Sequence, residues 1–472
     1  MWTSEVPSAA EEFRGAELGD KRLVKRLGRI AQALELAPEE SFPKRLEAAA
    51  ELEGFYRFVT NERVEWKALL AAHVEATRER LSGAKRVLLV QDSSDFVYSG
   101  ECARAGLGHL PRDRQGFKGH FCLALVPSEA EDEWAPMGVL KFQPLIRPKR
   151  ERPESDVQRR ARPREEKESG RWEQFAVESA ALLPEGCQAV HVMDREADDY
   201  ELYAALQQHQ QHFVVRSSDE RRLVVEEDGE PDRLFAALDS VHKVMLRRVV
   251  HLGARSKKHG DQEKSHPPRK AREAKLRVKA TRLTLRCPLH VKQAPASLTL
   301  NFVHVYEPHP PPGEQAVQWR LVTSLPIDTP EDVARVVDTY RARWCIEEYF
   351  KALKTGCSVE KRQLESAHAL LNALALFIPV AWRMLLLRTL SRQDTPHPAT
   401  CVLTHVQLHL LKLLSKRVAL PAHPTARQAT LALAGIGGHL KHNGEPGWIT
   451  IGRGYETLLM AELGWRAALG DL

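Results

Sequence analysis

The sequence predicts a mixed α/β fold that is flanked by helical regions. This prediction depends on two observations: β-branched apolar runs alternate with amphipathic helical segments in the middle of the chain, and helical patterns dominate both ends. The chain has 472 residues, which allows several domains at roughly 100 to 200 residues each. Apolar residues make up 43% and charged residues 28%, so the composition is that of a globular protein and excludes a disordered or fibrous one.

The first strong helical pattern is basic and amphipathic, and it begins near Asp20, a plausible N-cap. One face of this helix is apolar and carries Leu23, Leu27, Ile30, Ala31 and Leu34. The opposite face is basic and carries Lys21, Arg22, Lys25, Arg26 and Arg29. Further helices are expected at residues 46–58 and 64–81. The basic face is either an ordinary solvated surface or a surface that contacts phosphates, and the net charge of +6 favours a polyanionic partner only weakly.

The central part of the chain alternates between strand and helix patterns. Strands are expected at residues 86–92, 121–126, 137–142, 189–194 and 212–216, and helices at 175–183 and 200–208. Three more strands, at 244–250, 276–285 and 298–305, predict a β-rich insertion. Two charge-rich stretches, 147–167 and 255–275, are expected to be loops, the second as the tip of a hairpin within the insertion.

Cysteine spacing and hydropathy favour a cytoplasmic protein without a membrane partner. The 7 cysteines lie far apart and form no C-x-x-C pair, which argues against a zinc ribbon and a disulfide framework. The N-terminus lacks a basic segment followed by an apolar one, so no secretory signal is expected. The longest nearly uncharged stretch, from Ala369 to Trp382, is shorter than the roughly 20 residues of a membrane span and predicts a buried core helix.

Two aspartates, Asp92 and Asp194, each end an apolar run that is predicted to be a strand. Phosphodiester chemistry on nucleic acids commonly uses two divalent metal ions that are held by converging carboxylates. Both aspartates are therefore candidate ligands. The alternative for either residue alone is a turn or cap role, which is common for an Asp that follows a strand.

The segment from Tyr340 to Lys354 predicts a single helix, because its nearest breaker is Gly356. At about 100° per residue, an arc of about 60° around the helix axis contains four functional candidates: Tyr340, Arg343, Glu347 and Lys354. A face with a phenol, a guanidinium, a carboxylate and an ammonium group could hold a metal ion and a DNA phosphate side by side. The alternative is an ordinary helix with ion pairs along its surface.

In combination, these motifs resemble the insertion-sequence-four family of DDE cut-and-paste transposases, of the transposon-five type. The residues that carry the resemblance are Asp92 in VLLVQDSSD, Asp194 in VMDREAD, Arg216 in FVVRS, Trp319 in WRLVTS, and the pattern Y-x-x-R-x-x-x-E-x-x-x-x-x-x-K from Tyr340 to Lys354. Further matches are AELGDKR, GFYRF, EEKESGRW and the C-terminal GIGGHL and GEPGW. The resemblance extends over nearly the whole chain.

The resemblance implies an RNase H-like mixed-sheet catalytic core with a β-rich insertion. We expect an N-terminal helical domain that binds DNA ends at residues 1–80. The catalytic domain would follow at 81–375, with the insertion at about 220–325. A C-terminal helical domain at 376–472 would supply the dimer contact.

The resemblance also implies roles for individual residues. Asp92, Asp194 and Glu347 would be the catalytic triad and would bind Mg²⁺, with Mn²⁺ as a substitute. The remaining residues would bind DNA: Tyr340, Arg343 and Lys354 at the phosphate beside the transposon 5′ end, Trp319 by stacking on a flipped base, and Arg216 near the active site. A strand Trp is otherwise usually a core residue, and Arg216 could instead form a structural ion pair. Asp198 would support the site without belonging to the triad.

The implied activity is cut-and-paste transposition. The expected steps, in order, are a nick at the transposon end, formation of a hairpin, opening of the hairpin and strand transfer into target DNA. None of these steps needs a P-loop, and the sequence lacks that motif. The expected partners are double-stranded DNA (terminal inverted repeats and target DNA) and a second copy of the chain in a synaptic complex. The expected location is the bacterial cytoplasm, on the nucleoid when DNA is bound. Two alternatives are a non-catalytic DNA-binding derivative and a structure-specific nuclease.

Overall fold

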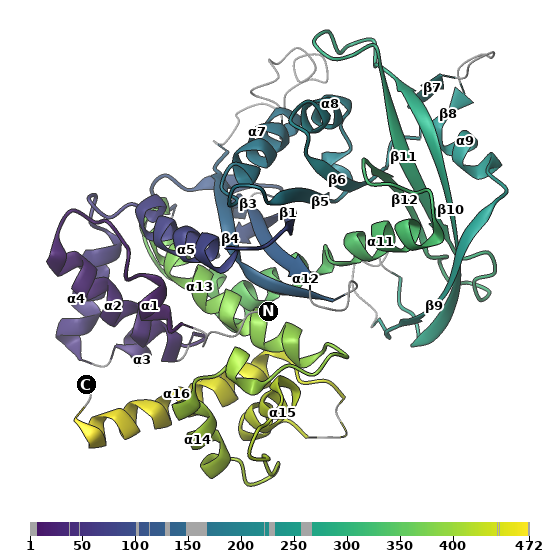
Figure 1. The fold of residues 1–472 in the computed structure, drawn as a ribbon. Coiled ribbons are helices and arrows are strands. Elements are labelled where there is room, and N and C mark those ends of the chain that lie inside the picture. The colour runs from purple at the N-terminus through teal and green to yellow at the C-terminus, as the bar shows by residue number, and fades with distance from the viewer. Residues whose placement is uncertain are drawn as a thin grey trace. The chain divides into compact units, whose positions relative to one another are not determined.

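The computed structural model describes residues 7–36, 38–46, 48–100, 103–112, 114–127, 133–147, 168–220, 222–225, 232–255, 267–440, 442 and 444–470. The chain forms two compact units. Unit 1 consists of Met1–Glu154, Leu182–Cys187 and Trp344–Leu472, and unit 2 consists of Ser155–Ala181 and Gln188–Arg343. Figure 1 shows that the chain is a mixed α/β protein. The predicted boundaries at residues 80 and 375 stay a prediction.

Unit 1 begins with helices, as the sequence predicts. They are α1 (Ala9–Glu12), α2 (Lys21–Leu36), α3 (Phe42–Arg45), α4 (Ala49–Val59) and α5 (Trp66–Arg80). In α2, the apolar face is buried at Leu27, Ile30, Ala31 and Leu34, and all five basic residues of the opposite face are exposed. Asp20 accepts a hydrogen bond of 2.8 Å from the backbone nitrogen of Arg22, so the predicted cap is confirmed. The basic face of α2 is therefore a solvent-facing surface.

The strands of unit 1 are antiparallel. They are β1 (Arg86–Val97), β2 (Gly108–Leu110), β3 (Arg114–Pro127) and β4 (Trp134–Leu145). β3 pairs with β1 along one edge, and with β2 and β4 along the other edge. Strands are confirmed at all three predicted positions, and each is longer than predicted.

The C-terminal part of unit 1 is helical. It contains α12 (Trp344–Lys351), a π-helical turn η3 (Ala352–Gly356), the short 3-10 turns η4 (Val359–Lys361) and η5 (Ala399–Cys401), and the helices α13 (Ala367–Ser391), α14 (His405–Leu414), α15 (Ala426–Ile436) and α16 (Trp448–Leu469). By length and composition alone α13 could cross a membrane, but its 18-residue apolar stretch is completely buried inside the protein. The predicted core helix is therefore confirmed, and it extends beyond the nearly uncharged stretch from Ala369 to Trp382 on which the prediction was based.

Unit 2 combines a small α/β layer with the β insertion. The α/β layer contains α7 (Glu168–Ala180), β5 (Gln188–Met193), the 3-10 turn η2 (Arg195–Ala197), α8 (Tyr200–Gln208), β6 (His212–Arg216), β12 (Gln318–Thr323) and α11 (Pro330–Arg341). β5 and β6 are parallel and are connected through α8, while β12 runs antiparallel to β6. This arrangement agrees with the alternating pattern of the sequence.

The insertion is β-rich, as predicted. It contains β7 (Leu223–Val225), β8 (Asp232–Arg233), α9 (Leu234–Ser240), β9 (Val244–Leu252), β10 (Arg272–Arg286) and β11 (Ser297–Tyr306). β9, β10 and β11 pair in antiparallel order, and β11 joins β12. The bridge between Arg255 and Arg269 confirms a hairpin, although residues 256–266 of its basic tip lie outside the described residues. The other charged stretch, at 148–167, lies outside them too.

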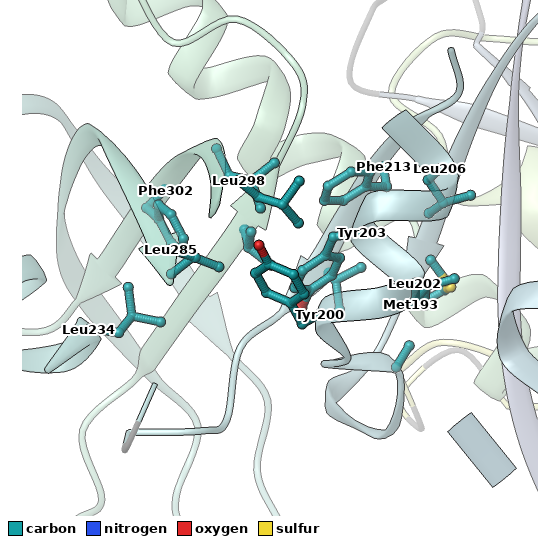
Figure 2. Close-up of a cluster of buried hydrophobic side chains, with 14 of the residues drawn as sticks. Met193, Tyr200, Leu202, Tyr203, Leu206, Phe213, Leu234, Leu285, Leu298 and Phe302 are labelled. Carbon is teal, nitrogen blue, oxygen red and sulfur yellow. The ribbon is translucent and has the colours of Figure 1, made fainter. Parts of the chain in front are cut away.

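The insertion and the α/β layer share one hydrophobic core. Figure 2 shows Leu285, Leu298 and Phe302 from the insertion in the same cluster as Tyr200 and Tyr203 from α8. The hydroxyl group of Tyr200 also donates a hydrogen bond of 2.8 Å to the carbonyl oxygen of Pro295. Because the two parts bury apolar surface against each other, the insertion is a fixed part of unit 2.

Candidate active site

Asp92 lies inside β1 and not at the end of a strand, which corrects the prediction from the sequence. The strand continues to Val97 because β3 pairs with it over this length, and Asp92 stands opposite Phe121. Oδ1 of Asp92 accepts a hydrogen bond of 2.7 Å from the backbone nitrogen of Ser93. A paired strand therefore fixes the backbone that carries this half-buried carboxylate.

Asp194 follows β5 directly, as predicted, and caps the short helix η2. Its Oδ1 accepts a hydrogen bond of 2.8 Å from the backbone nitrogen of Glu196. The cap interpretation is therefore correct for this residue. A carboxylate has about four lone-pair sites, so this single bond is compatible with a second role as a ligand.

Two adjacent glutamates, Glu347 and Glu348, lie in α12, and their surroundings differ. Glu348 forms ion pairs with Arg388 at 3.3 Å and with Lys351 at 2.6 Å. Burial acts to raise the pKa of Glu348, but these cations outweigh it and hold the pKa below its ordinary value. Glu347 lies in the first turn of α12, which packs against β1 within unit 1.

The helix predicted from Tyr340 to Lys354 is interrupted, so this prediction is wrong. α11 ends at Arg341, residues 342–343 form a turn, and α12 begins at Trp344. In this turn the backbone nitrogen of Arg343 bonds to the carbonyl oxygen of Tyr340, three residues back, at 3.1 Å. The angular estimate therefore does not apply across the whole segment. Tyr340 and Arg343 belong to unit 2, whereas Glu347 and Lys354 belong to unit 1.

Aromatic and basic candidates meet in unit 2. The rings of Trp319 and Tyr340 lie edge to face with centroids 5.5 Å apart, and the Arg343 guanidinium carbon lies 5.9 Å from the centre of the Tyr340 ring. Burial raises the pKa of Tyr340, and Asp194 adds to this effect, while Arg343 and Arg216 oppose it. Tyr340 is thus a neutral phenol at physiological pH, between groups of both charges.

Arg216 ends β6 and pairs in register with Leu321 of β12. Its Nη2 atom donates a hydrogen bond of 3.3 Å to the carbonyl oxygen of Gln318, the residue before Trp319. Among the residues that the structure describes, Arg216 forms no ion pair. The alternative of a structural ion pair is therefore not supported.

Lys354 lies in the π-helical turn η3 of unit 1. Its ammonium group donates a hydrogen bond to the carbonyl oxygen of Asp95, lies 3.5 Å from a carboxylate oxygen of Glu360 and lies 4.9 Å from the centre of the Phe96 ring. Glu360 also accepts a hydrogen bond of 2.8 Å from the backbone nitrogen of Val97. Sequence reasoning missed Glu360, which links Lys354 to β1, because no motif distinguishes it.

Asp198 is the centre of a buried hydrogen-bond network after Asp194. Its carboxylate accepts bonds of 2.6 to 3.1 Å from five donors: the hydroxyl groups of Tyr203 and Ser217, the backbone nitrogens of Ser218 and Asp219, and the guanidinium group of Arg222. Arg222 is a second residue that sequence reasoning missed. The network joins the turn that follows Asp194 to the segment that follows Arg216, so Asp198 supports both candidates.

The proposed metal ligands are distributed over both units. Asp92 and Glu347 belong to unit 1, and Asp194 belongs to unit 2. Within the described ranges, no group of three or more His, Cys, Asp or Glu side chains is arranged to hold a metal ion. The three side chains are all carboxylates, which are the donors that Mg²⁺ and Mn²⁺ prefer. The chemistry of the donors therefore fits these ions, and the assignment of the triad stays a prediction.

Comparison with known proteins identifies two regions of the chain. A family model described as transposase DNA-binding matches residues 7–64, which contain α1 to α4. A model described as transposase DDE domain matches residues 176–378. Asp194, Glu347 and all five DNA-binding candidates lie in this second range, and Asp92 lies outside both ranges.

A solved structure described as a cryo-EM structure of the piggyBac transposase synaptic complex with hairpin DNA is similar to this chain. The sequence identity is 10%, the TM-score is 0.36, and the match covers 79% of this chain and 67% of that chain. A likeness of this degree carries no argument about function.

The two matched regions define the class of protein. The chain is a DDE-domain transposase with an N-terminal DNA-binding domain and a DDE catalytic domain. It therefore binds DNA and performs transposition, and catalytic domains of this class use divalent metal ions.

Proposed function

We propose that the chain is a cut-and-paste transposase of the insertion-sequence-four family, of the transposon-five type, with an RNase H-like core. The observation that carries this proposal is the match of the transposase DDE domain to residues 176–378, a range that contains Asp194 and Glu347. The packing of α12 against β1, which bears Asp92, supports the inclusion of a third carboxylate.

Asp92, Asp194 and Glu347 are the proposed ligands of Mg²⁺ or Mn²⁺. Divalent ions bound by these carboxylates would supply activation of the attacking oxygen and neutralisation of charge on the leaving oxygen. The contribution of the chain is to hold the carboxylates on ordered elements, namely β1, the end of β5 and α12.

The DNA-binding roles follow from charge and ring geometry. Arg216 and Arg343 carry positive charge near the phenol of Tyr340, which suits a phosphate next to the reacting bond. Lys354 of unit 1 is a further proposed phosphate contact. Trp319 is half-buried, so part of its indole ring remains accessible for stacking on a flipped base.

The proposed reaction proceeds through direct displacements at phosphorus. Water attacks one strand at the transposon end, the P–O3′ bond breaks, and a 3′-hydroxyl group is released. This hydroxyl group attacks the opposite strand, and its proton leaves as the hairpin forms and the flanking DNA departs. A second water opens the hairpin, and the same 3′-hydroxyl group attacks a phosphodiester of target DNA. Two subunits would pair two ends in the bacterial cytoplasm, with the C-terminal helices as the dimer contact.

In vitro transposition tests this proposal. Full-length protein, a linear DNA with the flanks of its own gene and a circular target plasmid should give plasmid products that carry the inserted fragment. Asp92→Asn should bind the ends and give no insertion. The matched control is Glu75→Gln, which changes an exposed carboxylate of α5 in the same unit and should keep full activity. Binding and cleavage without any insertion would favour a nuclease.

A further inference from the structure

Three polar residues of unit 2 form a row across the sheet, on the face opposite Trp319. They are Lys279 of β10, His304 of β11 and Arg320 of β12, and they are paired in register. Successive side chains of a strand point to opposite faces of the sheet, so Arg320 lies on one face and Trp319 on the other. The contacts agree with this alternation, because Trp319 packs on Tyr340 of α11 whereas Arg320 contacts α9.

The C-terminal end of α9 contacts this row through Asp239. The carboxylate of Asp239 accepts hydrogen bonds of 3.2 and 3.3 Å from Nη2 of Arg320, and its backbone carbonyl oxygen accepts one of 3.4 Å from Lys279. Nδ1 of His304 lies 3.5 Å from the same carboxylate. The guanidinium carbon of Arg320 lies 4.1 Å from the centre of the Phe235 ring. α9 therefore holds β12 from the face that does not carry the indole ring.

Gln318, the residue before Trp319, is held on the same face. Its amide nitrogen donates a hydrogen bond of 3.1 Å to Nε2 of His304, a residue that is 5% exposed. Burial lowers the pKa of His304 to about 4, and the charge of Arg320 acts in the same direction. His304 is therefore neutral at physiological pH, and its Nε2 atom can accept this bond. Side-chain contacts thus fix both neighbours of Trp319 in the chain.

These contacts matter because the pairing of β12 with β6 is short. β12 pairs with β11 over residues 318–323, but with β6 at residues 321–323. One further backbone bond, of 2.7 Å, runs from the nitrogen of Ser217 to the carbonyl oxygen of Arg320. In the described sheet, the segment around Trp319 therefore has a partner strand along one edge, and the contacts with α9 add a second support.

We propose that Asp239 and Arg320 are positioning residues for Trp319, which rests on the base-stacking role proposed for this indole. A ring that receives a base binds it best when the ring is already held in place, because binding then does not have to immobilise it. The side chain of Asp239 is 55% exposed, and exposed ion pairs contribute little to overall stability. Loss of the pair should therefore displace Trp319 without unfolding unit 2.

Hairpin formation by the full-length protein, on DNA from the flanks of its gene, tests this proposal. Asp239→Asn should slow hairpin formation about threefold to tenfold relative to the first nick, because a displaced indole stacks less well on the base. Asp239→Glu keeps the charge and should recover most of the rate. Asp328→Asn is the matched control, since it changes an exposed ion pair with Arg282 in the same unit and should form hairpins at the normal rate. The unfolding midpoints of Asp239→Asn and Asp328→Asn should be equal.

A double substitution shows whether Asp239 acts through Trp319. The indole is already absent in Trp319→Ala, so the addition of Asp239→Asn should slow hairpin formation no further. Equal ratios of hairpin formation to nicking in Asp239→Asn and the unchanged protein, or an additive loss in the double variant, would overturn the proposal. Insertion and metal-dependent nicking by the unchanged protein test the proposed function without any change at Asp239, so the two failures are distinguishable.

Discussion

The indole ring of Trp319 and the phenol ring of Tyr340 lie edge to face, with ring centroids 5.5 Å apart. Trp319 comes from β12 and Tyr340 from the last turn of α11, so the contact joins two elements of unit 2. Tyr340 is only 5% exposed, whereas Trp319 is half-buried. Trp319 thus has one part that packs and another that is accessible, which suits a base-stacking residue better than a core residue.

Substitution of Trp319 should affect one step of the reaction more than the others. Trp319→Ala should slow hairpin formation about tenfold or more relative to the first nick, because stacking of a base on an aromatic ring contributes about 1 to 3 kcal/mol. Trp319→Phe should retain part of the rate. Time courses on denaturing gels separate the two steps. An equal loss of nicking and hairpin formation in Trp319→Ala would refute the base-flipping role.

Asp198 should be essential for the stability of unit 2. Its side chain and that of Arg222 are 3% and 6% exposed and lie 2.7 Å apart, so Asp198→Asn leaves a buried cation without its counterion. We expect a loss of about 3 to 5 kcal/mol, measured as a lower unfolding midpoint. Asp199→Asn is the control, because Asn also caps helices well and the cap of α8 should survive. Equal midpoints for the two variants would contradict this account of the network.

Acid should destabilise the protein through His191, a completely buried residue of β5. Burial lowers the pKa of His191 to about 4 in the folded state. The unfolded residue has a pKa of about 6.5 and binds a proton first, so the free energy of unfolding falls as pH decreases from 6.5 toward 4. The expected slope is about 1.4 kcal/mol per pH unit, and none of it is present above pH 6.5.

Unfolding midpoints between pH 7.5 and pH 4.5 measure this effect. His191→Gln should show a weaker dependence on pH than the unchanged protein, whereas His290→Gln, at an exposed position of the same unit, should not differ from it. The same dependence in His191→Gln as in the unchanged protein would assign the acid sensitivity to other groups.

Gly454 should be required where α16 crosses α15. A Cβ atom at this position would overlap the carbonyl oxygen of Leu433 in α15, so Gly454→Ala must separate the two helices and lower the unfolding midpoint. Gly464 lies in the same helix with open space around it, and Gly464→Ala should raise stability by up to about 1 kcal/mol. A Gly454→Ala variant as stable as Gly464→Ala would show that the helices adjust freely.

The elements were largely predictable from the sequence, because local patterns determine them. The apolar and basic faces of α2 follow from helical periodicity, and the β insertion follows from strand patterns that hairpins extend. The end of a strand is less predictable. β1 continues beyond Asp92 through polar residues because β3 supplies hydrogen bonds, and this pairing is a tertiary effect.

The candidate site was predictable only as a set of residues. The turn at residues 342–343 lies within a continuous helical sequence pattern. In this turn the backbone nitrogen of Arg343 bonds to the carbonyl oxygen three residues back in place of four, and this change leaves no trace in the pattern. Arg222 and Glu360 act through partners far away in the sequence, Asp198 and Lys354. Such partners become evident only from the fold.

The most direct test of the central claim is denaturing-gel analysis of DNA from the flanks of the gene, incubated with full-length protein with and without Mg²⁺. The account predicts nicks that require the metal ion and then convert to a hairpin species. Neither product should form with Asp92→Asn, while Glu75→Gln should form both. Nicks and hairpins from Asp92→Asn at the normal rate, or cleavage by the unchanged protein without divalent metal, would contradict the assignment of the catalytic carboxylates.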